Sequence, residues 1–156
     1  MRDSIGGAWL LGIVLVFMSV FIAYIAITIN YSNAFNMKTN MITIIEQYDG
    51  INPNSLAKID SLMQGYNYRI KSQCPVPEDN ATYIGVTDQI VTKNPTDRQS
   101  YCVYRERRDG EDGAENKYYY NLIVFFNFSL PVLGDLFTFQ ISSETNVIYY
   151  PNDPYF

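Results

Sequence analysis

The feature that most constrains the fold is an uninterrupted apolar run, AWLLGIVLVFMSVFIAYIAITI, at residues 8–29. No charged residue occurs between Asp3 and Lys38. An α-helix rises about 1.5 Å per residue, and about 20 apolar residues cross the hydrocarbon core of a bilayer. The run is therefore long enough to span a membrane once. No second apolar stretch of comparable length follows, so we expect one anchor and one water-facing domain.

A signal peptide and a buried helix are the alternatives to a membrane span, and both fit this run less well. A cleaved signal peptide has an apolar core of about 7–15 residues and small residues at its cleavage site. This run is longer, and no clear A-x-A pattern follows it. A buried helix of a soluble protein is usually apolar on one face, whereas this run is apolar on all sides. We therefore expect a retained single-pass helix in the cell membrane, with the lipid bilayer as a partner.

The direction of the anchor follows from two features. Arg2 lies in the short N-terminal tail, and positive residues beside a span favour the cytoplasmic side. Cys74 and Cys102 would pair as a disulfide outside the cytoplasm. A redox or metal pair is the alternative role for these cysteines, although two thiols alone do not complete a zinc site. We expect the C-terminal domain outside the cytoplasm.

The helix is predicted to continue beyond the apolar run to about residue 48. Residues 31–48 contain no Pro or Gly, and apolar residues recur near the helical period, among them Phe35, Ile42 and Ile45. This stripe packs either on the chain's own domain or on neighbouring subunits, or on both. Gly50 is a natural end of the helix. We therefore assign residues 1–50 to the anchor and its amphipathic continuation, and residues 51–156 to an extracytoplasmic domain.

The domain is predicted to have an α+β fold. Asn52 suits a helix N-cap and Pro53 the first helical turn, and Gly65 ends a short helix. Alternating or aromatic-rich segments then predict strands. They lie at residues 66–71, within 83–92, and at 101–107, 118–128 and 137–150, with a bend around Pro131 and Gly134. We expect an antiparallel sheet of four or five strands with both helices packed on one side.

Several function classes are disfavoured by composition. The chain has no histidine, which excludes imidazole-based catalysis and metal sites. No phosphate-binding loop or nucleophile motif occurs. The net charge is −5, without a concentrated basic patch, so a nucleic-acid partner is not expected. We predict no enzymatic activity, no cofactor and no small-molecule substrate.

A charged loop at residues 108–116 is the one candidate for a cation site. It contains four acids, and Ca²⁺ prefers several oxygen ligands. Their spacing does not match an EF-hand, and a solvated hairpin tip accounts for them more simply. The four acids are Asp109, Glu111, Asp112 and Glu115.

The layout resembles the TadE-like minor pilins, accessory pilin-like proteins of bacterial tight-adherence (Tad) pili. A short tail leads directly into the apolar run, which continues as the amphipathic segment SNAFNMKTNMITIIEQYDGI. A short helix and a loop containing Cys74 follow. Late in the chain come an apolar strand, a Leu-Pro bend and a final polar strand, YYYNLIVFFNFSLPVLGDLFTFQISSETNVIYY. The resemblance covers most of the chain.

The resemblance implies a pilin-like fold and a structural or assembly role in a bacterial surface pilus used in adhesion, or in a secretion apparatus. Its partners would be other pilin-like subunits or pilus assembly proteins. Helices would bundle through Gly7, Ala8 and Gly12, and Gly6 or Gly7 would precede a processing site with Ala8 as the first mature residue. Members often carry a Glu shortly after this site, whereas Gly12 occupies the fifth position here. The alternative is a bitopic envelope protein whose outer domain binds a ligand or partner without polymerising.

Overall fold

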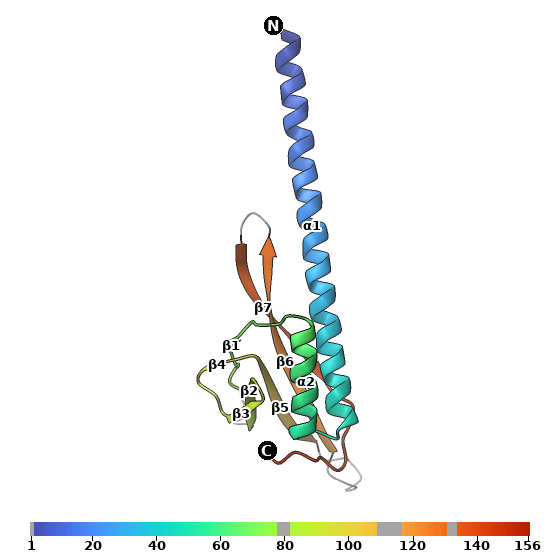
Figure 1. Cartoon of the computed structure of the whole chain (residues 1–156), viewed down its shortest axis with the longest axis vertical. Coiled ribbons are helices and arrows are strands. Elements are labelled where there is room, and N and C mark those ends of the chain that lie inside the picture. Colours follow the sequence, from blue (N-terminus) through green and yellow to red (C-terminus); the bar gives the residue numbers. More distant parts are fainter. Residues whose placement is uncertain (1, 78–81, 109–116, 131–133) are drawn as a thin grey trace.

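One long helix, α1 (Arg2–Gln47), extends from the folded body as a straight rod (Figure 1). The computed structural model describes residues 2–77, 82–108, 117–130 and 134–156, and the side chains of 2–8, 128–130 and 134–137 are outside this description. The helix has 46 residues and no break where the apolar run ends. The prediction that it continues beyond the apolar run is confirmed.

The turn between α1 and α2 (Pro53–Gly65) follows the expected capping chemistry. The Gly50 amide donates to the Ile45 carbonyl oxygen at 2.9 Å, and Gly50 adopts a φ of +126°, a conformation that favours glycine. The Asn52 side-chain oxygen accepts hydrogen bonds from the Asn54 and Ser55 amides, both at 3.0 Å. The Ser55 hydroxyl accepts from the Asn52 amide in return, at 2.9 Å. The predicted bounds of the second helix are confirmed.

The sheet is antiparallel and has five strands in the order β3-β2-β5-β6-β7 within the described part of the chain. The strands are β2 (Tyr83–Thr87), β3 (Ile90–Lys93), β5 (Tyr101–Arg108), β6 (Lys117–Leu130) and β7 (Gly134–Glu144). A separate small pair joins β1 (Ser72–Gln73) to β4 (Arg98–Gln99). The predicted α+β class and the antiparallel sheet are confirmed.

Three predicted strands differ from the structure. The prediction at residues 66–71 is wrong, because this segment pairs with no strand. The Tyr68 hydroxyl instead bonds to the backbone of Phe125, donating to its carbonyl oxygen and accepting from its amide. The strand predicted within 83–92 is present as β2, but a second strand, β3, follows it, since Asp88 and Gln89 form a turn with φ of 49° and 64°. The last strand ends at Glu144 and does not reach residue 150. Pro131 lies outside the described residues.

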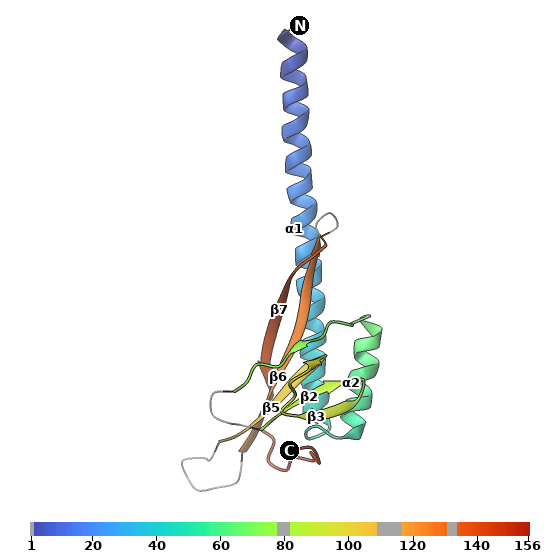
Figure 2. The same cartoon turned by 90° about the vertical axis from the view of Figure 1, so that its left-hand side faces the viewer.

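Both helices pack on one face of the sheet, as Figure 2 shows with the sheet in front of α1. The core between these layers is apolar, and its largest members are almost completely buried. They include Met37, Met41 and Ile45 of α1, Ile59 of α2, and Ile84, Val103, Tyr120 and Leu122 of the sheet. The predicted arrangement of helices on one side is confirmed.

The C-terminal segment ties the end of α1 to the sheet. The Asn152 amide donates to the Asp49 carbonyl oxygen at 2.7 Å. Arg105 binds the Asp153 carboxylate at 2.9 Å, and the Tyr120 hydroxyl donates to the same carboxylate. Because Asp153 is nearly buried, losing one partner of this pair would leave a costly unpaired charge. The C-terminal half of α1 and the sheet therefore form one body.

Candidate functional site: the projecting half of the long helix

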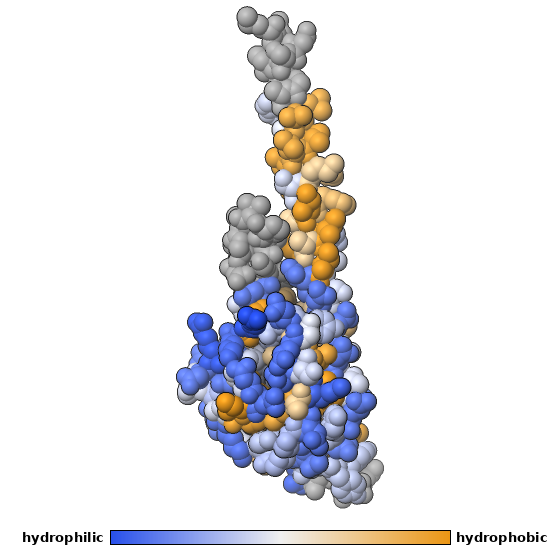
Figure 3. Space-filling model, in the orientation of Figure 1, coloured by the Kyte–Doolittle hydropathy of each residue, from blue (hydrophilic) through white to orange (hydrophobic). Residues whose placement is uncertain are grey.

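The N-terminal half of α1 presents its apolar side chains to the surroundings on all sides. Trp9 is 74% exposed, Leu15 59% and Phe17 68%. Figure 3 shows this surface as hydrophobic, in contrast to the largely hydrophilic body below it. Exposed apolar patches of this extent are rare on soluble monomers and mark surfaces covered by a membrane or a partner. The half from Trp9 to Ile29 is called the projecting half.

The projecting half is long and apolar enough to cross a membrane, and among the described residues no other helix is. The most apolar window has no part buried inside the chain. The alternative of a buried core helix in a soluble protein is therefore wrong for this chain. The helix also continues unbroken into the body, so cleavage after the apolar run would divide a single hydrogen-bonded rod.

The lower half of α1 has a different surface. Ala34, Met37, Met41 and Ile45 are buried, and their spacing of three or four residues places them on one side of the helix. Their neighbours Thr39 and Thr43 are exposed, and each hydroxyl donates to a carbonyl oxygen four residues earlier. The change from all-round to one-sided apolarity occurs just after Ile29.

The predicted helix-contact residues fall into two groups. Ile42 and Ile45 are buried in the chain's own core, which is the first of the two alternatives for this stripe. Phe35 is 46% exposed, and a Cβ added at Gly12 would meet no atom within 4 Å. These two positions are open to a neighbour, and their contact with one stays a prediction.

The predicted processing residues lie inside α1. Gly6, Gly7 and Ala8 have helical backbone, and their side chains are outside the described part. Processing there and packing of Gly7 and Ala8 against other helices stay predictions. The acidic loop with Asp109, Glu111, Asp112 and Glu115 also lies outside the described residues.

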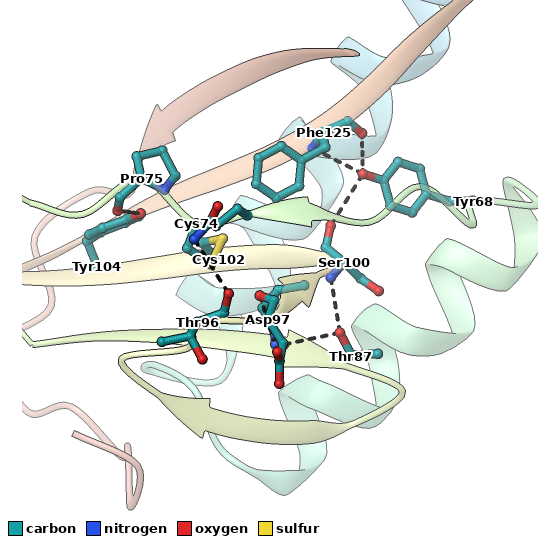
Figure 4. Close-up of a disulfide and its surroundings, with 12 residues drawn as sticks. Tyr68, Cys74, Pro75, Thr87, Thr96, Asp97, Ser100, Cys102, Tyr104 and Phe125 are labelled. Carbon is teal, nitrogen blue, oxygen red and sulfur yellow. Dashed lines mark hydrogen bonds between the residues drawn. A yellow bond between two sulfur atoms is a disulfide. The ribbon is translucent and has the colours of Figure 1, made fainter. Parts of the chain in front are cut away.

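The predicted disulfide between Cys74 and Cys102 is present, with the two Cα atoms 5.8 Å apart (Figure 4). It holds the segment that follows α2 against the outer face of the sheet. Tyr83 and Tyr104 stack beside it at 5.3 Å between ring centroids, and the Tyr104 hydroxyl donates to the Pro75 carbonyl oxygen. Burial raises the pKa of the Tyr104 hydroxyl above its ordinary value. The disulfide thus closes a second, smaller core.

A cleft of about 570 Å³ lies between α2 and the β2–β3 turn. Leu56 and Met63 contribute apolar surface. The Asp60 carboxylate accepts hydrogen bonds from Gln64 at 2.9 Å and from Gln89 at 3.0 Å, which joins the helix to the turn. Among the described residues, no group of three or more Cys, Asp or Glu side chains is placed to hold a metal ion.

A smaller groove of about 280 Å³ lies where the projecting half meets the body. Asn30, Asn33 and Met37 of α1 form one wall, and Arg69 and Asn127 lie opposite. No local sequence pattern indicates this groove, because its walls come from three segments that only the fold brings together.

The projecting half is thus a surface that the described part of the body does not bury, and the groove beside its lower end joins exposed Asn33 and Arg69 to the edge of the core at Met37. Both begin or end at the boundary after Ile29, where the composition of α1 changes. Comparison of this chain with protein-family models, with curated proteins and with solved structures finds no match.

Proposed function

We propose that this chain is a membrane-anchored, pilin-like structural or assembly subunit of a bacterial surface pilus or secretion apparatus, similar to the TadE-like proteins. The projecting half of α1 holds the subunit in the bilayer before assembly. During assembly, the same surface packs against the helices of other pilin-like subunits. The body faces the exterior and forms the outer surface of the assembly.

One observation carries this proposal: a single unbroken helix is apolar on all sides in its upper half and one-sided in its lower half. Lipid and the surface of a like helix are both apolar, so the projecting half is compatible with either environment. Association of helices in lipid depends on close packing at small residues, and Gly12 offers such a place. Because α1 continues unbroken into the body, the position of each body relative to its projecting half is fixed.

The orientation we propose is N-terminus inside and body outside. The Cys74–Cys102 disulfide supports it, because disulfides persist in oxidising compartments. Arg2 supports it as well, because positive residues beside a span favour the cytoplasmic side. We propose no catalytic role, since the chain lacks histidine and carries no nucleophile motif.

Filament shearing tests the proposal directly. A tagged full-length chain should occur both in the membrane fraction and in filaments sheared from intact cells. Gly12→Leu should stay in the membrane fraction but be depleted from the sheared filaments, because its side chain blocks close approach of helices. Val14→Leu is the matched control, because it adds one methylene at an exposed position that already carries a branched apolar side chain. Absence of the unsubstituted chain from all sheared material would contradict the proposal.

A second candidate function is a bitopic envelope protein that binds a ligand or partner without polymerising. The cleft between α2 and the β2–β3 turn favours it, because apolar surface there is combined with convergent polar groups at Asp60, Gln64 and Gln89. The same fractionation separates the two candidates. A chain that is retained in the membrane and never sheared off would favour the ligand-binding function.

A further inference from the structure

We propose that the groove between α1 and residues 66–70 binds the phosphate of an anionic phospholipid headgroup. This inference rests on the proposed membrane anchor and adds a specific lipid contact to it. The groove has a volume of about 280 Å³, and Phe126 and Asn127 of β6 complete its walls. It is called the boundary groove below.

The position of the boundary groove matches the depth of lipid phosphates. Its α1 wall starts at Asn30, one residue after the apolar run, and extends to Met37. Seven residue steps cover about 10 Å along a helix. The headgroup region of each leaflet is about 5–8 Å thick, from the difference between total and hydrocarbon thickness. An anchor that places residues 8–29 in the hydrocarbon therefore sets the groove beside the headgroups.

Arg69 supplies the charge that would recognise a phosphate. Its side chain is exposed, and within the described part of the chain it makes no hydrogen bond or ion pair. A guanidinium offers donors in a planar fork that matches phosphate oxygens. None of the described residues that line the groove is acidic. Arg69 also lines the cleft that contains Asp60 and Asp88, but it forms no ion pair with either carboxylate among the described residues.

Amide side chains complete the polar side of the groove. Asn30, Asn33 and Asn67 line it, and none of their side-chain amides has a partner among the described residues. Each amide can donate two hydrogen bonds to headgroup oxygens. Ala34 and Phe126 provide apolar surface next to these donors, which suits the start of the acyl chains. A phospholipid carries acceptor oxygens next to apolar acyl chains, so the polar donors and the apolar surface of the groove are complementary to it.

Lys38 adds a second cation at the same level of α1. Its residue surface is only 9% exposed, and its ammonium lies 4.4 Å from the centroid of the Phe35 ring. Phe35 lies about one turn nearer the apolar run, so the ammonium is directed towards the membrane side. Long basic side chains commonly bury their stems and extend their charge to the headgroups in this way. Positive potential at this level favours anionic over zwitterionic lipid.

Native mass spectrometry of the full-length chain released from detergent micelles tests the lipid site. We expect the chain to retain phosphatidylglycerol in several-fold preference to phosphatidylcholine. Arg69→Gln should remove this preference while its membrane retention and melting temperature stay unchanged, because Arg69 is exposed and makes no hydrogen bond or ion pair with any residue that the structure describes. Asn33→Asp should also weaken it by placing a negative charge in the groove. Lys93→Gln removes one charge from the edge strand β3 and should behave as the unsubstituted chain.

Three results would overturn the inference. Equal retention of the two lipids by the unsubstituted chain would show that no anionic headgroup is selected. An unchanged preference in Arg69→Gln would remove the groove as its site. Retention of inorganic phosphate in preference to phosphatidylglycerol at equal concentration would assign the site to free phosphate instead. Failure of the unsubstituted chain to stay in membranes would overturn the proposed membrane anchor. Fractionation measures that outcome, and mass spectrometry measures lipid retention, so the two failures are distinguishable.

Discussion

The two halves of α1 share one helical backbone and differ in how polar and apolar side chains are distributed around it and in how many of them are buried. The projecting half is apolar on all sides and buries none of its large side chains in the chain. The lower half alternates buried Met37, Met41 and Ile45 with exposed threonines and asparagines. Helical hydrogen bonds are satisfied in both. The distribution of polar residues around the helix, and not the helix itself, therefore decides which medium each half occupies.

This difference predicts that anchoring and folding are separable. Among the described residues, no side chain of the projecting half belongs to either core cluster, so we expect its apolar surface to contribute to membrane partitioning and not to the stability of the body. The lower half forms one wall of the core, so its burial contributes to folding free energy. Each variant below tests whether an effect stays within its half.

The largest effect is expected from Ile45→Ala. Ile45 is completely buried, and removing its side chain leaves a cavity against the sheet. We expect a loss of about 4 kcal/mol in the unfolding free energy of the body, measured by chemical denaturation in detergent. Val14→Ala, in the projecting half, is the control and should leave this free energy nearly unchanged. Equal losses of unfolding free energy in the two variants would show that both halves of α1 contribute to the stability of the body.

Loss of the disulfide should act on the body alone. In the chain-entropy model, a separation of 28 residues corresponds to about 3.5 kcal/mol of stabilisation. Cys74→Ser should therefore lower the melting temperature of the body without changing its membrane retention. Reducing agent should produce the same shift in the unsubstituted chain and none in the variant. An unchanged melting temperature would argue against a stabilising role for this bond.

Leu15→Arg should act on the anchor alone. A charged residue near the middle of a span costs about 3 kcal/mol of insertion free energy. We expect a clear decrease in the fraction that resists alkaline extraction from membranes, while the body keeps its unfolding free energy. Leu15→Val is the matched apolar control. Normal retention of the arginine variant would be inconsistent with residues 8–29 lying in lipid.

The smallest effect is expected at the start of α2. Asn52→Ala removes the hydrogen bonds to the Asn54 and Ser55 amides and should cost about 1 kcal/mol of the body's stability. Asn54→Ala changes the same residue type two positions later, outside the cap. Thermal unfolding of the two variants side by side measures the difference. A larger loss in Asn54→Ala would reverse our assignment of the cap.

Local signals in the sequence predict the helices better than the strands. Asn52, Pro53 and Gly65 carry their own capping preferences, so the second helix is predictable at its observed bounds. The alternation of Tyr66, Tyr68 and Ile70 has the period of a strand, but this segment pairs with no strand and is held by a tertiary hydrogen bond from the Tyr68 hydroxyl to Phe125. The turn at residues 88–89 contains no glycine or proline, so the hairpin has no local signal.

The candidate site is predictable only where it depends on one segment. Uniform apolarity at residues 8–29 indicates an exposed anchor, and two cysteines indicate a disulfide, without knowledge of the fold. The stripe at Ile42 and Ile45 could not be assigned to the body or to a neighbour, because both would select the same residues. The boundary groove joins Asn30, Arg69 and Asn127, which are distant in the sequence. Such a surface has no local signature.

The fluorescence of Trp9, the single tryptophan of the chain, tests the central claim most directly. Its side chain is 74% exposed on the projecting half, at the start of the proposed span, where indoles prefer the headgroup region. In vesicles, we predict strong quenching by lipids brominated near the headgroup and weak quenching by acrylamide in the water. Strong acrylamide quenching without any effect of brominated lipid would place the helix in water and contradict a membrane anchor.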